Sequence, residues 1–116
     1  MTIHRIEAGP RMSQAVVLNG TVYVAGQVAL EAPGASVAEQ TRTVLARIDR
    51  LLAAAGSDKT KLVQATIWIT DISPFDEMNK VWDAGVAPGC TPARATVESK
   101  LAAPQFTVEI AVVAGL

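Results

Sequence analysis

The fold is decided first by residues 14–25, QAVVLNGTVYVA, in which two apolar runs flank Asn19-Gly20. Both residues of an Asn-Gly pair tolerate the positive φ angles of a two-residue turn, so the pair between apolar runs is a strong hairpin signal. We therefore predict antiparallel strands at residues 14–18 and 21–25. A short strand is also expected at residues 3–6, so the chain begins with β structure.

A long amphipathic helix is predicted after a loop at residues 31–35. Ser36, with Glu39 three residues later, is typical of a capping box at a helix start. Residues at helical spacing then form one continuous stripe, which we expect to be core: Val37, Thr41, Val44, Leu45, Ile48, Leu51, Leu52 and Ala55. Gly56 fits the C′ position that ends such a helix.

The second half of the chain continues the alternation of strands and helices. A strand is predicted at residues 62–70, with Val63, Ala65, Ile67 and Ile69 on one face. A second helix is expected to use Ser73 as N-cap and Pro74 as its first residue. It places Phe75, Met78, Asn79, Trp82 and Val86 on one face.

Two strands close the chain, at residues 92–98 and 105–114. The order β-β-β-α-β-α-β-β predicts an α+β sandwich, in which a mixed sheet of about six strands carries two helices on one face. The final strand is apolar on both faces, which favours cover by helices on one side and by a partner subunit on the other. The length of 116 residues predicts a single domain over residues 1–116.

Composition narrows the classes of function. Half of the residues are hydrophobic, which is rich for a small monomer and favours an oligomer. A net charge of −1 and the absence of a basic stripe argue against a nucleic-acid partner. The first residues lack the apolar stretch of a signal peptide, and no run approaches the roughly 18 apolar residues of a membrane helix. Together with a lone cysteine, Cys90, these features predict a cytoplasmic protein.

Arg94 and Glu109 are the candidate chemical groups, because each is a charged residue in a largely apolar strand-like segment. A guanidinium is a rigid fork of donors that suits a carboxylate. A carboxylate on a neighbouring strand can hold a water or carry a proton. The pair therefore suggests a pocket that grips a small acid and adds water to it. A structural salt bridge between the two residues is the alternative.

Other chemistries find little support in the chain. The single histidine, His4, is near the N-terminus and is expected to be exposed. Metal-ligand spacing and a glycine-rich phosphate loop are both missing, so neither a metal site nor a phosphate-binding loop is expected. Cys90 precedes the strand at residues 92–98 and is expected to be a packing or interface residue rather than a reactive thiol.

The segments Pro92-Ala93-Arg94-Ala95-Thr96-Val97 and Val108-Glu109-Ile110 resemble the C-terminal motif of the RidA/YjgF/UK114 family. Residues 25–28 and 75–82 are similar to further parts of the same family, so the resemblance covers nearly the whole chain. It implies a chorismate-mutase-like α+β sandwich, a homotrimer with sites at the subunit interfaces, and hydrolysis of 2-imino or 2-enamino acids to 2-oxo acids and ammonia without a cofactor.

The resemblance also implies site roles, residue by residue. Arg94 would bind the substrate carboxylate and Glu109 would orient or deprotonate the water. The backbone of Gly26 would line the pocket, and the backbone N–H of Thr96 would help to hold the carboxylate. Asn79 would lie near the site in a structural role.

The chain also departs from the family pattern. Met12 stands where many members have a tyrosine that lines the pocket, and Ala25, Thr96 and Gly85 stand where a serine, a cysteine and an aromatic residue are common. These departures leave two alternatives to the deaminase open. One is a non-catalytic module that binds a small carboxylate, and the other is a pathway-specific hydrolase or isomerase of a related enamine or carbamate.

Overall fold

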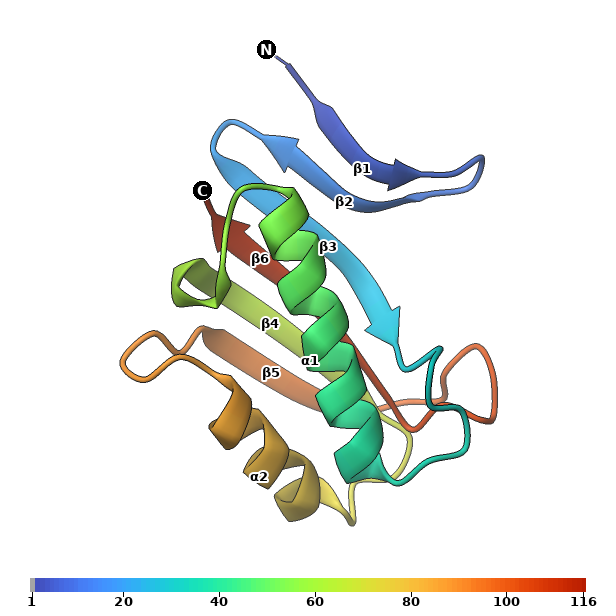
Figure 1. Ribbon diagram of the computed structural model, residues 1–116. Coiled ribbons are helices and arrows are strands. Elements are labelled where there is room, and N and C mark those ends of the chain that lie inside the picture. Colours follow the sequence, from blue (N-terminus) through green and yellow to red (C-terminus); the bar gives the residue numbers. More distant parts are fainter. Residues whose placement is uncertain (1) are drawn as a thin grey trace.

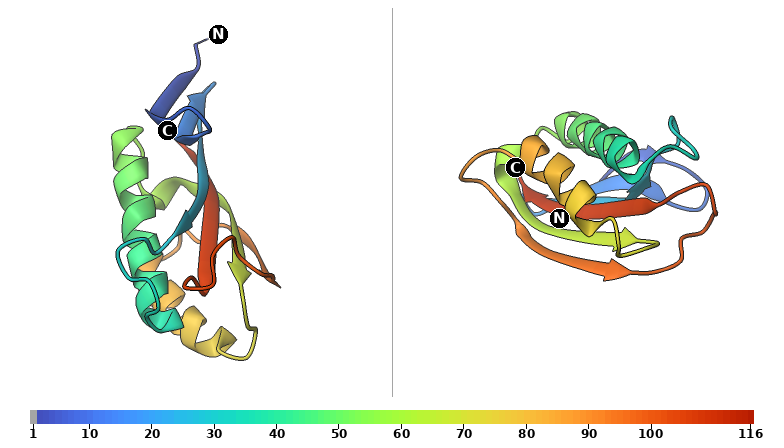
Figure 2. Two further views of the ribbon diagram at one scale, coloured as in Figure 1. Left: turned by 90° about the vertical axis from the view of Figure 1, so that its right-hand side faces the viewer. Right: turned by 90° about the horizontal axis from the view of Figure 1, so that it is seen from below.

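The computed structural model describes residues 2–116, which form a six-stranded sheet and two long helices (Figure 1). The strands are β1 (His4–Ala8), β2 (Ser13–Leu18), β3 (Thr21–Val28), β4 (Leu62–Ile69), β5 (Ala93–Glu98) and β6 (Val108–Gly115). The helices are α1 (Val37–Ala54) and α2 (Phe75–Gly85), and a 3₁₀ turn, η1, spans Lys59–Lys61. Both helices lie on one side of the sheet (Figure 2). The predicted α+β sandwich, with its order of elements, is confirmed.

The sheet has the order β1-β2-β3-β6-β4-β5, so the last strand in sequence lies inside the sheet and β5 lies at an edge. All neighbouring strands are antiparallel except β4 and β5. A parallel pair needs a crossover connection, and α2 supplies it. The predicted hairpin is β2–β3, whose turn has positive φ angles at Asn19 and Gly20.

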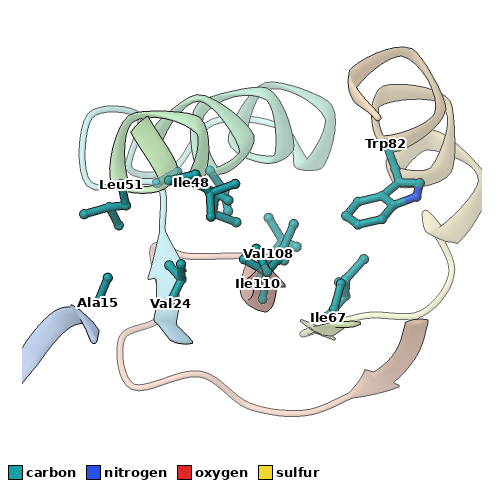
Figure 3. Close-up of a cluster of buried hydrophobic side chains, with 14 of the residues drawn as sticks. Ala15, Val24, Ile48, Leu51, Ile67, Trp82, Val108 and Ile110 are labelled. Carbon is teal, nitrogen blue, oxygen red and sulfur yellow. The ribbon is translucent and has the colours of Figure 1, made fainter. Parts of the chain in front are cut away.

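The core lies between the sheet and the helices (Figure 3). Alternate residues of the strands point to the helices and are buried, among them Val22, Val24, Ala65, Ile67, Ile69, Val108, Ile110 and Val112. The stripe of α1 covers the middle of this face, while Trp82 of α2 covers the side of β4, and Met78 of α2 belongs to the same buried cluster. Val63 is an exception to the predicted face: it is exposed, because the pairing of β4 with β6 shifts between Leu62 and Gln64.

The helix starts confirm one prediction and correct another. The Ser36 Oγ accepts a hydrogen bond from the Glu39 backbone N–H at 3.2 Å, as expected of an N-cap. Ser73 is not the N-cap of α2, which is Pro74. The Ser73 N–H donates to the Asp71 carboxylate at 2.9 Å, so an Asx turn precedes the helix and shifts its start by one residue.

The predicted start of the final strand at residue 105 is wrong, because β6 begins at Val108. The Phe106 N–H bonds to the Ala103 carbonyl in a turn, and the Thr107 N–H bonds to the buried Gln40 side chain at 2.9 Å. These backbone donors are therefore satisfied before the strand ladder begins.

The opposite face of the sheet carries no helix (Figure 2). Alternation along β4 and β6 turns Thr66, Trp68, Ala111 and Val113 to this open face, where they are only partly buried. Tyr23 of β3 is exposed there as well, with 48% of its surface accessible. In a single chain, the apolar residues on the second face of β6 are thus not covered by a helix.

Candidate functional site

Arg94 lies on the helix-facing side of the edge strand β5. Its register partner on β4 is Ala65, which is buried in the core, so both side chains point toward the helix layer. The Arg94 Nη1 donates to the Asn79 Oδ1 of α2 at 2.8 Å. Its guanidinium carbon also lies 5.3 Å from the ring centroid of Trp82 and 5.9 Å from that of Phe75. Helix α2 therefore orients the guanidinium through one amide and two aromatic faces.

Glu109 lies on the open face of the sheet. Its register partner is Trp68, and the flanking residues Val108 and Ile110 point into the core, so the carboxylate is turned away from the helices. Within residues 2–116 its carboxylate accepts no hydrogen bond and joins no ion pair. It is partly exposed and free to meet a water or a ligand from the open side.

Gly26 lies directly against this carboxylate. A Cβ atom at Gly26 would come within 2.1 Å of the Glu109 Oε2. Glycine is therefore required here for close approach of backbone to side chain. The structure thus brings two of the sequence-predicted site residues, Gly26 and Glu109, into contact.

A bulge in β3 creates this contact. Val24 pairs with Val112 and Gln27 pairs with Ile110, so two residues of β3, Ala25 and Gly26, oppose Ala111 alone. A bulge of this kind bends the strand and changes the direction of neighbouring groups. Neither the bulge nor the contact that it produces was predicted from the sequence.

Met12 is exposed in the connection between β1 and β2, where its carbonyl accepts a hydrogen bond from the Gly9 N–H. Antiparallel pairing of Ala15 with Val24 places Met12 at the same end of the sheet as the bulge. We therefore assign Met12 to the same side of the candidate site as the β3 bulge, and its role in substrate binding stays a prediction.

Thr96 belongs to the other side, with Arg94. Its register partner is the buried Ile67, so Thr96 faces the helix layer. Its Oγ1 is buried without a hydrogen-bond partner among the described residues. It also borders a groove of about 440 Å³ with Ile72, Ser73, Phe75 and Asp76. The groove adjoins the Arg94 group, because Phe75 both lines the groove and lies beside the Arg94 guanidinium.

The candidate residues thus form two groups on opposite faces of the sheet, one around Arg94 and one around Glu109. Strand β4 lies between their strands, so the interpretation of β5 and β6 as neighbours is wrong. The alternative of a structural salt bridge is also wrong: the ion pairs among residues 2–116 join Arg47 to Glu31 and Arg50 to Glu7. One chain cannot bring both groups onto one small molecule.

A separate groove of about 440 Å³ lies between α1 and α2, and none of the predicted site residues lines it, although Gly85 does. A Cβ at Gly85 would come within 2.8 Å of the Leu45 Cδ1, so Leu45 fills the space beside this glycine. Burial raises the pKa of Asp49 in the same groove, and the nearby Lys59 opposes that rise. The Gly85 departure therefore affects helix packing rather than the Arg94 or Glu109 groups.

Two buried glutamines and one arginine were missed by the sequence analysis. Gln27 and Gln40 are 1% and 0% exposed, and Arg47 bonds to Gln27 from α1. A signal for Gln40 was available, since it lies three residues after Val37 and four before Val44 within the buried stripe. Gln27 gave no such signal because only the bulge fixes the direction of its side chain.

Residues 2–116 contain no group of three or more His, Cys, Asp or Glu side chains close enough to share a metal ion. None of their helices combines the length and apolarity needed to cross a membrane. His4 is exposed on β1, and Cys90 is a partly exposed free thiol between α2 and β5.

Known proteins share this fold, and their sequences align with nearly the whole chain. The family model described as "Endoribonuclease L-PSP" matches residues 2–116. The RutC family protein YoaB of Escherichia coli is 43% identical over the full length of both chains. A rat 2-iminobutanoate/2-iminopropanoate deaminase is 32% identical over 108 residues, which cover 88% of this chain and 77% of the rat protein.

A crystal structure of a YjgF family member from Neisseria meningitidis has the same arrangement of elements. It is 48% identical, it superposes with a TM-score of 0.95, and the match covers 99% of this chain and 95% of that one. The chorismate-mutase-like fold that the sequence resemblance implied is thereby confirmed. Since a family model spans nearly the whole chain and full-length relatives exceed 40% identity, the protein belongs to the YjgF/RidA (RutC, L-PSP) family.

Proposed function

We propose that the protein hydrolyses reactive 2-imino and 2-enamino acids to 2-oxo acids and ammonia, at sites formed between the subunits of a cytoplasmic homotrimer. The rat relative is named as a deaminase of this kind, which gives the substrate class. The family membership and the arrangement of Arg94 support applying it here.

The observation that carries the proposal is that Arg94 has no acidic partner among residues 2–116. Its guanidinium is held by the neutral amide of Asn79 and by two aromatic faces, and no carboxylate of residues 2–116 pairs with it. A partly buried cation without an anionic partner is costly unless a ligand supplies the charge. A planar fork of donors fits the carboxylate of a 2-imino acid in a bidentate manner.

The two separated groups support a site between subunits, and the family resemblance implies that the assembly is a trimer. The Arg94 group lies at the edge strand, and the Glu109 group lies on the open face of the sheet. The edge of one subunit placed against the open face of the next would bring Arg94 of one copy to Glu109 of its neighbour. The same contact would cover the apolar residues that a single chain leaves open.

In the proposed reaction, Arg94 and the Thr96 N–H hold the substrate carboxylate. Glu109 of the adjoining subunit orients a water and accepts its proton as the oxygen bonds to the imine carbon. Glu109 passes that proton to the nitrogen, which gives the carbinolamine. In the collapse, Glu109 takes the hydroxyl proton, the C=O double bond forms as the C–N bond breaks, the same proton passes to the nitrogen, and ammonia leaves. One imine and one water thus give one 2-oxo acid and one ammonia. Positioning supplies much of the acceleration, and proton transfer adds about 10²–10⁴-fold.

The test uses 2-iminopropionate made in situ by an amino-acid oxidase. Wild-type protein is expected to speed release of the 2-oxo acid, and Arg94→Ala is expected to abolish that effect while the trimer persists in light scattering. Arg42→Ala, an exposed arginine of α1, is the matched control and should retain full activity. Full activity of Arg94→Ala would refute the proposal.

A second candidate is a non-catalytic module that binds a small carboxylate. It is favoured by Met12, an exposed apolar side chain at a position where many relatives carry a tyrosine. Calorimetry that shows tight binding of a 2-oxo acid, together with no rate enhancement for any imino acid, would select this candidate. A hydrolase or isomerase for one related enamine or carbamate would instead turn over that compound alone.

A further inference from the structure

Arg47 of α1 is directed into the structure. Its side chain is only 14% exposed, whereas that of Arg50, three residues later, is 52% exposed. The Arg47 Nε and Nη2 donate to the Gln27 Oε1 at 3.2 and 3.1 Å, and its Nη1 donates to the Glu31 carboxylate at 3.0 Å. All of these bonds reach from the helix to β3 and to the segment that follows it.

Both the oxygen and the nitrogen of the Gln27 side-chain amide form hydrogen bonds. The Oε1 accepts both bonds from Arg47, while the Nε2 donates to the Gln14 side chain and to the Ala25 carbonyl, each at 3.0 Å. Because arginine can only donate, it fixes which end of the amide is the oxygen. The nitrogen must then point toward the Ala25 carbonyl.

That carbonyl belongs to the β3 bulge. Ala25 and Gly26 together oppose Ala111, so the strand ladder is interrupted there and the Gln27 amide supplies a hydrogen bond to the Ala25 carbonyl. The next residue, Gly26, is in contact with the Glu109 carboxylate on the open face. A continuous set of contacts therefore runs from Arg47 through Gln27 and the bulge to Glu109.

We propose that Arg47 is a positioning residue: from the helix side of the sheet it holds the bulge in the form that sets the Glu109 carboxylate on the opposite face. The inference rests on the proposed hydrolase function for its kinetic consequence only, since the position of the carboxylate can be measured without activity. Loss of the Arg47 donors would free the Gln27 amide to turn, and the Gly26 backbone would then no longer hold the carboxylate in one place.

The test compares Arg47→Met, which keeps an unbranched apolar stem, with Arg50→Met as the matched control. Arg50 is on the same helix and bonds to Glu7, away from the bulge. With 2-iminopropionate, Arg47→Met is expected to lower kcat on the order of 10-fold or more, because misplaced reacting groups are costly. KM is expected to stay within about 2-fold, because Arg94 holds the substrate carboxylate. Arg50→Met should change neither value.

The second measurement is the ¹³C resonance of the Glu109 carboxylate, assigned with Glu109→Gln. It is expected to shift in Arg47→Met and not in Arg50→Met. Should Arg47→Met fail to fold, Arg47→Lys, which supplies a single ammonium to the Gln27 oxygen, is expected to show a smaller shift and an intermediate kcat. An unchanged resonance in the folded variant overturns the proposal. If the wild-type protein shows no turnover of 2-iminopropionate, the proposed hydrolase function is wrong. The ¹³C resonance of the Glu109 carboxylate still tests the role of Arg47 in that case.

Discussion

At the scale of single residues, the contact between Gly26 and Glu109 links backbone geometry to chemistry. Only a hydrogen atom fits between the Gly26 Cα and the carboxylate, and the nearest atom to an added Cβ is the end of a flexible side chain. An added methyl group would therefore move the carboxylate more easily than it would move the strand. The residue controls where Glu109 lies rather than whether the sheet forms.

If the proposed hydrolase function holds, Gly26→Ala is accordingly expected to lower the rate of imine hydrolysis by roughly 10-fold or more, since the displaced carboxylate would no longer position the attacking water. The free energy of unfolding should change by about 1 kcal/mol or less. Steady-state kinetics and urea denaturation measure the two effects. Gly115→Ala is the matched control, because nothing lies within 4 Å of its added Cβ. A stability loss in proportion to the activity loss would contradict this assignment.

At the scale of elements, the local patterns predicted most of the fold. The Asn19-Gly20 turn, the α1 stripe and the Ser36 cap all depend on residues close in sequence, and each was correctly predicted. The placement of β5 beside β4 rather than beside β6 depends on pairing between distant segments, which alternation within a strand does not encode. For that reason the sequence identified Arg94 and Glu109 as charged residues in apolar strands but not their separation onto two faces.

Buried polar side chains, like the order of the strands, were not predicted from the sequence. The Gln40 amide donates to the Ala35 and Gln105 carbonyls at 3.1 and 3.0 Å and accepts from the Thr107 N–H at 2.9 Å. It therefore joins the start of α1 to the segment that enters β6. A glutamine in a helix is expected at the surface unless the partners of its amide are known, and here two of the three partners, Gln105 and Thr107, are 65 and 67 residues away.

Gln40→Leu keeps the side-chain size but leaves three backbone groups without their partner. The free energy of unfolding is expected to fall by roughly 3 kcal/mol, because buried unpaired polar groups carry their desolvation cost. Urea denaturation measures the change. In the control, Gln105→Leu alters an exposed side chain whose backbone carbonyl stays in place, and it should change stability by about 0.5 kcal/mol or less. Equal effects of the two substitutions would show that the Gln40 amide does not stabilise this junction.

At the scale of the whole molecule, the division of the site between two faces has a quantitative consequence for mixed assemblies. If each site takes Arg94 from one copy and Glu109 from the next, Arg94→Ala and Glu109→Gln are both inactive alone and complement each other when mixed. A site is intact when one neighbour keeps the arginine and the other keeps the glutamate. Random mixing in equal amounts makes each of these conditions hold half of the time.

Joint unfolding and refolding of the two variants is therefore expected to restore about a quarter of wild-type turnover, in the ring of like contacts that a symmetric oligomer forms. The release of 2-oxo acid from 2-iminopropionate measures it. Each variant refolded alone is the control and should stay inactive. A mixture with no activity, from an assembly shown by mass spectrometry to contain both variants, would mean that the two residues do not serve one shared site.

The place of β6 inside the sheet has a consequence for how the chain folds. It is the last strand in sequence, yet it joins β3 to β4, and its Gly115 pairs with Thr21. Until it enters, β3 and β4 present unpaired edges, and such edges are templates for pairing with other chains. Contacts between residues so far apart in sequence form slowly. Refolding at high concentration is thus expected to lose yield to aggregation before β6 is inserted, and dilution or rapid capture of that strand would recover the native protein.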